Sequence, residues 1–568
     1  VPGASMQIKI RGQNTLRIGE GDYPLYIVDG VPIASNPVGT YGQLFSSSVG
    51  IDPLNSLNPS NIKSIEVLKG PDATSIYGSR GANGVVLITT KNGESGKTSI
   101  ALNMSTHIGQ VANKLNLLNT PQYLEMRKEA FVNDGATPTE TNAADLLLWD
   151  QNRYTDWQEE LIGNTAHITE INTSMTGGSE RTRFLVGGGY RNETTVFPGD
   201  FGYKKMMLNA RADHNSVDNR LMVDMAINYG FDAHTLFNSN ILEQALRLEP
   251  NAPALYLDNG ELNWGEDSLG NPTFKNPMAP LLNTNNFESS KLIYNLGFRY
   301  KITEELFFKT NIGFTEFHQK EIVKQTKNSI NPQNRPFSKH NSRHLQHDSR
   351  SLIFEPQLGH ILKWPNADLT TLVGATVQYD SSEQLGIEGR GYIHESLIGN
   401  LLSAEEKAIL LDTENEYRYS GLYARLGYRL KERYFLNLTG RRDGSSRFGP
   451  GNRFANFGAI GAAWIFSAEP FVQRNLSFLN FGKIRGSYGT TGNDQIPDYG
   501  YLATYSNIVD PSNFRGNGGL YPTRLGNPSY QWELNKKMEV AIDLGFFKDR
   551  LVSSITWYRN RSSNQLVG

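Results

Sequence analysis

Alternation of apolar and polar side chains is the feature that most constrains this chain, and it recurs from Thr98 to the end of the 568 residues. In Gly421–Leu430, GLYARLGYRL, every second residue is apolar, and Leu221–Gly230 and Met538–Phe547 repeat the pattern. A period of two places one apolar face along a β-strand. We count about fifteen such segments, each of roughly ten residues, which is the length of a strand that crosses a bilayer obliquely. The pattern therefore predicts an all-β chain built mainly of membrane-crossing strands.

Composition agrees with this prediction. The mean hydropathy is −0.45, and the sequence contains no run of 18 apolar residues. Barrel strands alternate lipid-facing and lumen-facing residues, so their average hydropathy resembles that of a soluble protein. Strands of soluble sandwiches also alternate, but they are usually shorter, about five or six residues. A membrane barrel is therefore favoured, and a soluble glycan-binding β-protein remains the alternative from another class.

Charge and cysteine content exclude several functions. The net charge is −2 at pH 7, which gives no general attraction to nucleic acid. The sequence has no Cys, so disulfides, thiolate metal sites and cysteine nucleophiles are ruled out. No Ser/His/Asp set or carboxylate pair stands out, and we predict no enzymatic activity.

The connections between the segments are uneven in length. Arg429–Arg433 and Phe547–Arg550 read as tight turns, whereas long polar connections are predicted at Phe231–Ser290, Lys320–Ser349 and Asp380–Arg418. Short turns on one rim and long loops on the other are typical of outer-membrane barrels. Two segments are predicted to be helical and to lie outside the barrel wall, Pro121–Phe131 and Ala143–Ile162.

The first ninety residues are organised differently. Short predicted strands alternate with turns rich in Gly and Pro, at Gln7–Arg11, Pro24–Val28, Ser64–Leu68 and Val85–Thr90. The stretch Val67–Gly93, VLKGPDATSIYGSRGANGVVLITTKNG, reads as a stiff β-turn-β unit. We therefore divide the chain into a domain at residues 1–93 and a second domain at residues 94–568.

Several stretches imitate chemical sites. Gly93–Thr98 resembles part of a phosphate-binding loop, but Lys91 stands where that motif needs a glycine, so we interpret it as a hairpin turn. His340, His344, His347 and Asp348 are interpreted as a solvated loop that enters a strand. Asp258–Glu261 reads as a plain turn; a structural calcium ion there is conceivable but is not predicted. We predict no cofactor and no metal.

Several motifs resemble the plug signature of TonB-dependent outer-membrane transporters, namely Ile65–Pro71, Ile76–Ser79 and Asn83–Ile88. Other motifs are more narrowly similar to the SusC/RagA branch of these transporters. They are Ile8–Gly12, Pro24–Ile33, Arg80–Val86, Ile88–Gly93, Arg441–Gly449 and Lys483–Asn493.

The resemblance implies a transmembrane antiparallel β-barrel in the outer membrane, with an N-terminal α/β plug domain in its lumen. The family barrel has 22 strands, more than the roughly fifteen segments counted here. We therefore expect the sequence to be a fragment. The first part of the plug, the signal and TonB-contacting segments, and the C-terminal strands are expected to lie outside it.

The resemblance also implies a function. It is TonB-dependent active import of an oligosaccharide or a peptide, with a SusD-like surface lipoprotein as a lid. The expected partners are TonB with its inner-membrane energising complex, the lid, the ligand and outer-membrane lipid, and no nucleic acid. Two alternatives stay open, a SusC-like scaffold subunit without import activity and a lidless receptor for metal chelates or vitamins.

The candidate site residues all lie in the plug motifs, and we expect them to act in structure or gating. The glycines suit turns with positive φ or close backbone approach. The charged side chains of Glu66, Lys69 and Arg80 are expected to pair in a polar lumen and hold the plug closed. Arg425, Arg429, Lys483 and Arg485 would form either a structural ladder on the inner wall or a polar path. The full set of site residues is Arg11, Gly12, Asp29, Gly30, Glu66, Lys69, Gly70, Tyr77, Gly78, Arg80 and Gly84.

Overall fold

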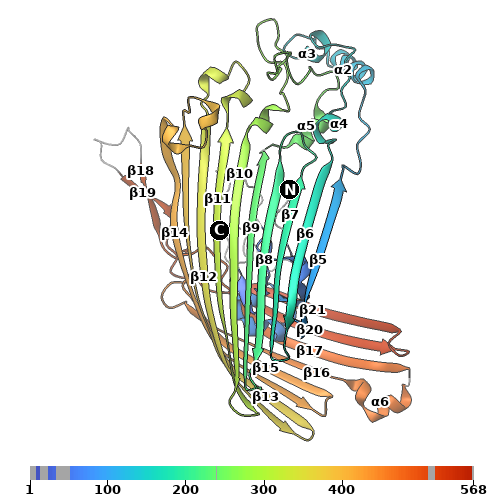
Figure 1. Ribbon diagram of the computed structural model, residues 1–568, viewed down its shortest axis with the longest axis vertical. Coiled ribbons are helices and arrows are strands. Elements are labelled where there is room, and N and C mark those ends of the chain that lie inside the picture. Colours follow the sequence, from blue (N-terminus) through green and yellow to red (C-terminus); the bar gives the residue numbers. More distant parts are fainter. Residues whose placement is uncertain are drawn as a thin grey trace.

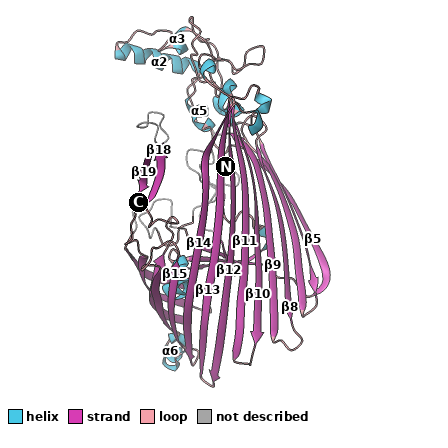
Figure 2. Cartoon of the chain, turned by 90° about the vertical axis from the view of Figure 1, so that its left-hand side faces the viewer, coloured by secondary structure: helices cyan, strands magenta, loops and turns pink. Residues whose placement is uncertain are grey.

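The computed structural model describes residues 8–12, 23–33, 52–237, 239–476, 478–508 and 519–565. A tall, strongly curved sheet forms most of the molecule, and a small sheet lies against its concave side (Figures 1 and 2). Among the described residues, none of the helices has both the length and the apolar character needed to span a bilayer.

Among the described residues, fifteen strands form the large sheet, which confirms the count made from the sequence. Neighbouring strands are antiparallel and follow the chain order from β5 to β21, and the described strands β18 and β19 pair with each other outside this sheet. The strands are β5 (Gly96–Gly109), β6 (Ala166–Gly178), β7 (Thr182–Thr194), β8 (Gly202–Asn215), β9 (Leu221–Phe237), β10 (Thr284–Lys301), β11 (Leu306–Gln325), β12 (Asn341–Trp364), β13 (Ala367–Arg390), β14 (Glu406–Leu430), β15 (Tyr434–Ser445), β16 (Phe454–Trp464), β17 (Leu479–Asn493), β20 (Glu533–Phe546) and β21 (Leu551–Ser563).

The two faces of these strands match the predicted alternation. On β14 the outward Leu422 is 63% exposed, whereas its neighbour Tyr423, which points to the concave side, is 4% exposed. On β20 Met538 and Val540 are exposed and Glu539 is buried. The large sheet therefore presents an apolar outer face and a polar inner face, as a membrane barrel requires.

The two rims of the large sheet differ as predicted. Residues 431–433 and 547–550 are tight turns, and Lys431 and Phe547 have positive φ there. The opposite rim carries the long connections 110–165, 238–283, 326–340, 391–405 and 494–532 (Figure 2). Short turns mark the periplasmic rim of such barrels and long loops the extracellular rim.

The predicted bounds of three long connections were wrong, because the strands continue into segments that read as polar. β9 runs on to Phe237, β11 runs on to Gln325, and β13 and β14 add strand residues up to Arg390 and from Glu406. Beyond the bilayer both faces of a strand can meet water, so the apolar half of the alternation disappears while the ladder hydrogen bonds remain.

Short helices and one long helix lie on the long-loop rim. The prediction at Pro121–Phe131 is confirmed by α2 (Thr120–Asp134), which begins at an Asn119–Gln122 capping box and ends at Gly135. The single helix predicted at Ala143–Ile162 was wrong; two short helices form, and Asp156 caps the second. The α-helices of this region are α3 (Ala144–Leu147), α4 (Trp157–Ile162) and α5 (Ile241–Arg247), with η4 (Ala279–Leu282), η5 (Lys327–Ser329), η6 (Arg335–Phe337), η7 (Glu395–Leu397) and η8 (Leu401–Ser403) as 3-10 turns.

These rim elements enclose their own apolar core. Trp157, Leu161, Ile241 and Phe274 belong to one buried cluster that joins the connections 110–165, 195–201 and 238–283. We call these three connections the loop module. Other described elements that follow β16 and lie outside the large sheet are η9 (Phe466–Ala468), α6 (Pro470–Asn475), β18 (Thr504–Ile508) and β19 (Gly519–Arg524).

The small sheet has the strand order β2-β1-β4-β3. Strand β1 is parallel to β4, whereas the other two pairs are antiparallel. We call the described residues 8–12, 23–33 and 52–90 the plug. Its elements are β1 (Leu25–Val28), β2 (Val31–Ile33), η2 (Pro59–Asn61), β3 (Ile62–Leu68), α1 (Pro71–Thr74), η3 (Ser75–Gly81) and β4 (Val85–Thr90).

Two predictions for the plug were wrong. Gln7 lies outside the described residues, and Ile8–Arg11 forms no strand, because Arg11 and Gly12 have φ of 58° and 86° and bend the chain. The β-turn-β unit is joined by α1 and η3 rather than by a plain turn. Pro71 at the first helical position favours that helix. The predicted division at residues 93 and 94 falls between β4 and β5.

Candidate functional site: the plug–wall interface

The candidate site is the contact between the plug and the inner face of the large sheet, which we call the wall. It combines hydrogen bonds, ion pairs and an apolar contact, and it brings together motifs that are hundreds of residues apart in the sequence. Its residues are described here from the centre of the interface outward.

The segment Ile76–Arg80 sits on two charged residues of β15. Arg441 Nη1 donates to the backbone oxygen of Ile76 at 2.6 Å, and the backbone N–H of Ser79 donates to Asp443 Oδ2 at 2.9 Å. The Arg441 and Asp443 side chains pair with each other and are 1% and 0% exposed. Gly78 is required here, since a Cβ on it would lie 2.2 Å from Asp443 Oδ2.

Arg80 extends from the same segment to the next wall strands. Its Nη1 donates to Gln378 Oε1 at 2.7 Å, and its Nη2 lies 3.4 Å from Glu355 Oε1. The guanidinium also stacks 4.9 Å above the ring of Tyr419, whose hydroxyl accepts a hydrogen bond from Arg441 at 2.9 Å. Buried Arg side chains need several such partners to offset their desolvation.

Asp29 and Gly30 form the two-residue turn between β1 and β2, with φ of 48° and 93°. Such a turn favours Asp-Gly because both residues need positive φ. The Asp29 carboxylate accepts from the Thr90 backbone N–H at 2.9 Å and from Arg211 Nη1 of β8 at 2.9 Å. Asn295 of β10 donates to the Asp29 backbone oxygen at 2.6 Å. The turn is thus fixed to two wall strands.

Arg11 lies against β20 and β21. Its guanidinium is 2.6 Å from Glu539 Oε2, stacks 4.5 Å above the ring of Tyr558, and donates weakly to the Lys69 backbone oxygen at 3.5 Å. Gly12 has no neighbour within 4 Å of an added Cβ, so its positive φ alone favours glycine. Gly70 precedes α1, and an added Cβ would lie 3.5 Å from Glu539.

Other predicted site residues do not reach the wall by their side chains. Glu66 and the Lys69 side chain are exposed among the described residues, so their pairing in the lumen stays a prediction. Tyr77 packs on Leu25, Ile27 and Val85 within the plug, and burial raises the pKa of its phenol. Gly84, with φ of 97°, leaves room for Ile10.

The wall partners are the residues that sequence reasoning did not identify. Arg441 and Asp443 of the Arg441–Gly449 motif contact the Ile76–Ser79 motif directly, and the length of both motifs was the only signal in the sequence. Further wall side chains bind the plug backbone or its amides. They are Lys291 to the Pro53 oxygen at 2.7 Å, Lys205 to Asn55 Oδ1 at 3.0 Å, Asn172 to Asn58 at 2.8 Å, Asn209 to Asn61 at 2.5 Å, and Lys537 to the Ala82 oxygen.

An apolar contact completes the interface on one side. Val31, Ile33 and Leu57 of the plug share a buried cluster with Ile293 of β10 and Ile353 of β12. This contact excludes water from the β10–β12 side of the plug. As a whole, the interface can hold the plug in place and can release it only if many directional bonds break together.

Two of the stretches that imitate chemical sites form ordinary strand and turn structure. Within the described residues, no group of three or more His, Asp or Glu side chains is arranged to hold a metal ion. His344 and His347 belong to strand β12 rather than to a loop. Gly260 N donates to the Leu257 oxygen at 2.9 Å, so this segment forms the expected turn.

Comparison with known families and proteins agrees with this architecture. Residues 1–85 match the TonB-dependent receptor plug domain, and residues 228–568 match the TonB-dependent receptor-like β-barrel. TonB-dependent receptor P26 of Formosa agariphila is 28% identical over all of this chain and 55% of its own length. TonB-dependent receptor SusC of Bacteroides thetaiotaomicron is 24% identical over all of this chain and 56% of its own length. The chain thus spans about half the length of these curated relatives.

Solved structures show the same fold. The RagAB peptide importer in its open-open state matches all of this chain and 64% of the compared chain, with a TM-score of 0.82 and 22% identity. The ferric citrate transporter FecA in its unliganded form matches 99% of this chain and 64% of its own, with a TM-score of 0.58 and 11% identity.

Proposed function

Because the chain belongs to the TonB-dependent receptors of the outer membrane, we propose that the complete protein actively imports a large nutrient and that the plug is its gate. The observation that carries this proposal is the plug–wall interface. The plug is fixed to wall strands from β6 to β21, and its contacts on the concave side of the sheet are largely polar and buried.

Such an interface supports a closed resting state. The buried contacts that Arg441 and Asp443 make with the Ile76–Arg80 segment would have to separate before a large solute could pass beside that segment. Local opening of so many buried contacts is rare when it depends on thermal fluctuation alone. The work must therefore come from outside the barrel, and we assign it to TonB and its inner-membrane complex, driven by the proton gradient.

We further propose that the cargo is an oligosaccharide or a peptide and that a SusD-like surface lipoprotein captures it. The SusC/RagA-like motifs support the branch, and the fold similarity to a complex described as a peptide importer supports a peptide as one of the two cargoes. The folded loop module on the long-loop rim offers a surface for such a lid. A SusC-like scaffold without import activity is the competing proposal.

Uptake measurements on cells that carry the complete gene test this function. Radiolabelled oligosaccharide or peptide pools should enter wild-type cells, and uptake should stop when TonB is deleted or the proton gradient is collapsed. Binding at the cell surface should persist in both cases, because the outer half of the protein is unchanged.

Undiminished uptake without TonB would contradict active import. Normal growth and protein assembly with no cargo bound or imported under any condition would favour the scaffold instead. Purification of the protein from outer membrane without any surface lipoprotein would contradict the lid.

A further inference from the structure

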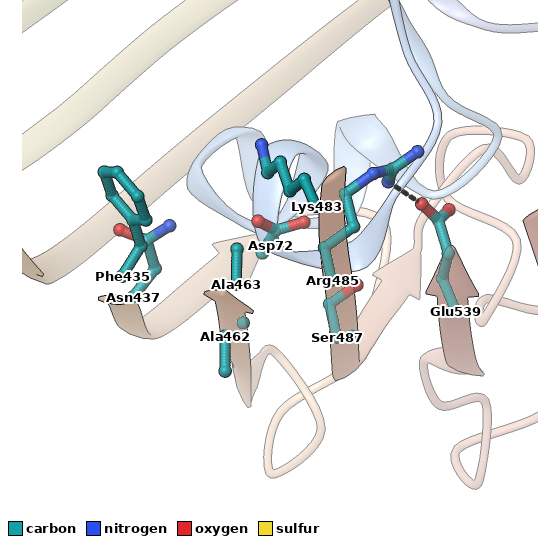
Figure 3. A pocket seen from close by; sticks show the side chains of 11 residues that line it. Asp72, Phe435, Asn437, Ala462, Ala463, Lys483, Arg485, Ser487 and Glu539 are labelled. Carbon is teal, nitrogen blue, oxygen red and sulfur yellow. Dashed lines mark hydrogen bonds and ion pairs between the residues drawn. The ribbon is translucent and has the colours of Figure 1, made fainter. Parts of the chain in front are cut away.

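Among the described residues, the plug meets the wall around a polar cavity on the α1 side and through apolar contacts on the Val31 side. A cavity of about 190 Å³ lies between helix α1 and the inner face of β15–β17 and β20, whereas the β10–β12 side is sealed by the apolar cluster at Val31 (Figure 3). We propose that the cargo passes through this gap, between α1 and β15–β17. This inference rests on the proposed import function and adds the route and the residues that line it.

The lining of the gap is polar and of mixed charge. The plug contributes Asp72, and the wall contributes Asn437, Lys483, Arg485, Ser487 and Glu539 (Figure 3). Arg485 pairs with Glu539 and lies 3.4 Å from Asp543, so two of the charges are held in place. Of the four cations proposed from the sequence as a ladder or a path, Lys483 and Arg485 thus line this cavity.

Lys483 and Asp72 face the same cavity without forming an ion pair in the described part of the chain (Figure 3). Opposite charges left apart in a wet cavity cost little, because water solvates both. The gap can therefore widen between Asp72 and Lys483 without breaking an ion pair, whereas widening toward β20 would separate Arg11 from Glu539. On the Val31 side the same movement would expose buried apolar surface to water.

Small wall residues create the space. Gly461, Ala462, Ala463 and Gly486 form the floor of the cavity, and Gly461 lets Asp72 approach the wall closely. Phe435 lies at the end of the cavity next to the turn 431–433, on the short-turn rim. Because short turns mark the periplasmic rim, the gap leads toward the side on which cargo must leave.

The lining also indicates the kind of cargo. Both signs of charge, an amide and a hydroxyl line the cavity, so a flexible polar chain can exchange hydrogen bonds along it without being selected by net charge. This suits a peptide or an oligosaccharide, and it does not suit an apolar solute.

Two disulfides can test the route, because this chain has no Cys of its own. A Cβ on Gly461 would lie 3.0 Å from the Asp72 Cβ, which is shorter than the roughly 3.5–4.5 Å of a disulfide, so a small outward shift of α1 is needed for D72C/G461C to close the gap. A Cβ on Gly313 of β11 would lie 2.6 Å from Val31 Cγ1, where the sulfur of a cysteine would sit, so V31C/G313C would fix the opposite side. Both pairs are made in the complete protein, with any other cysteines changed to serine.

Uptake is measured before and after reduction, with disulfide formation checked by mass spectrometry. Oxidised D72C/G461C should lose uptake about ten-fold or more and recover it on reduction, whereas oxidised V31C/G313C should stay within about two-fold of the unsubstituted protein. Loss in V31C/G313C alone, loss in both, or loss in neither would overturn the route. TonB-dependent uptake by the reduced variants would show that they fold and import. Absence of TonB-dependent uptake in the unsubstituted protein would instead count against the proposed function.

Discussion

At the scale of single residues, the position of the plug depends on a glycine that has no side chain and on an arginine whose guanidinium has several donors. Gly78 has φ of 63° and ψ of −142°, and it rests on the Arg441–Asp443 pair without a side chain. Arg441 then contacts the Ile76 backbone, Tyr419 and Asp443 at the same time. A planar guanidinium with five N–H donors can do this, and an ammonium cannot.

Gly78→Ala should weaken the seating of the plug. The backbone strain alone costs about 1–3 kcal/mol, and the added Cβ would also meet Asp443 and Arg441. In the complete protein purified in detergent, we expect trypsin to cleave the plug faster than in the unsubstituted protein. Gly135→Ala is the matched control, since its φ is 61° and no atom lies within 4 Å of an added Cβ. Equal protection of the plug in both variants would contradict the proposed contact.

Arg441→Gln should loosen the plug more strongly. The change removes the bond to the Ile76 oxygen and leaves the Asp443 carboxylate buried without its cation, a loss of about 3–5 kcal/mol. We expect cells that express the variant to become sensitive to vancomycin, a large antibiotic that the intact outer membrane excludes.

Arg442→Gln provides the control for that experiment. Arg442 is the next residue on β15, points to the outer face, and donates to Asn456 at 3.1 Å. Its loss should leave vancomycin resistance unchanged. Unaltered resistance in both variants, at equal protein levels, would show that Arg441 does not hold the plug.

At the scale of the elements, each wall strand carries a lipid face and a plug face. β14 shows the contrast in two adjacent residues, since Leu426 is 41% exposed on the outer face and Arg425 belongs to the inner face. The alternation of β14 was recognisable in the sequence because one face of the strand meets apolar lipid and the other face meets the polar inner side of the sheet.

Leu426→Arg should therefore destabilise the barrel by about 2–4 kcal/mol if the residue lies near the bilayer midplane, because the guanidinium would enter hydrocarbon. Arg425→Leu should be milder. The measurement is the fraction of complete protein that shows heat-modifiable migration on a gel after assembly in the outer membrane. Equal tolerance of the two substitutions would count against a lipid-facing position for Leu426.

At the scale of the whole molecule, three bodies meet: the wall, the plug on its concave side, and the loop module on one rim (Figures 1 and 2). The plug shares buried bonds and apolar contacts with the wall. The loop module instead has an apolar core of its own around Trp157 and Leu161. The loop module should therefore unfold independently of the barrel, with its own free energy of unfolding.

Trp157→Ala tests this expectation. Trp157 is 3% exposed and donates from Nε1 to the Glu249 oxygen at 2.8 Å, so its loss should cost the loop module about 3–5 kcal/mol. We expect proteases to cut residues 110–165 and 238–283 on intact cells while the barrel keeps its heat-modifiable migration. Tyr154→Ala, at a side chain that is 57% exposed, should change neither property. Loss of the folded barrel in Trp157→Ala would show that the two bodies fold as one.

Local periodicity determined the strands, because a strand between lipid and a polar lumen must alternate at every second residue. The strand number, the outward face of β14 and the tight turns at 431–433 and 547–550 followed from that requirement. Periodicity did not predict the structure where a segment does not lie between lipid and a polar lumen. The polar ends of β11 and β13 beyond the bilayer read as loops, and Ala143–Ile162 read as one helix although Asp156 starts a new one.

The contacts between plug and wall were decided only by the tertiary structure. The sequence marked Arg80 and Gly78 as special, but not that Glu355, Tyr419 and Asp443 would meet them across hundreds of residues. It assigned Glu66 and Arg80 the same role, although only Arg80 is buried. Whether a charge is paired or solvated depends on which surfaces the fold brings together. The sequence pattern gives the spacing of residues along one strand, but it does not say which strand or loop lies opposite.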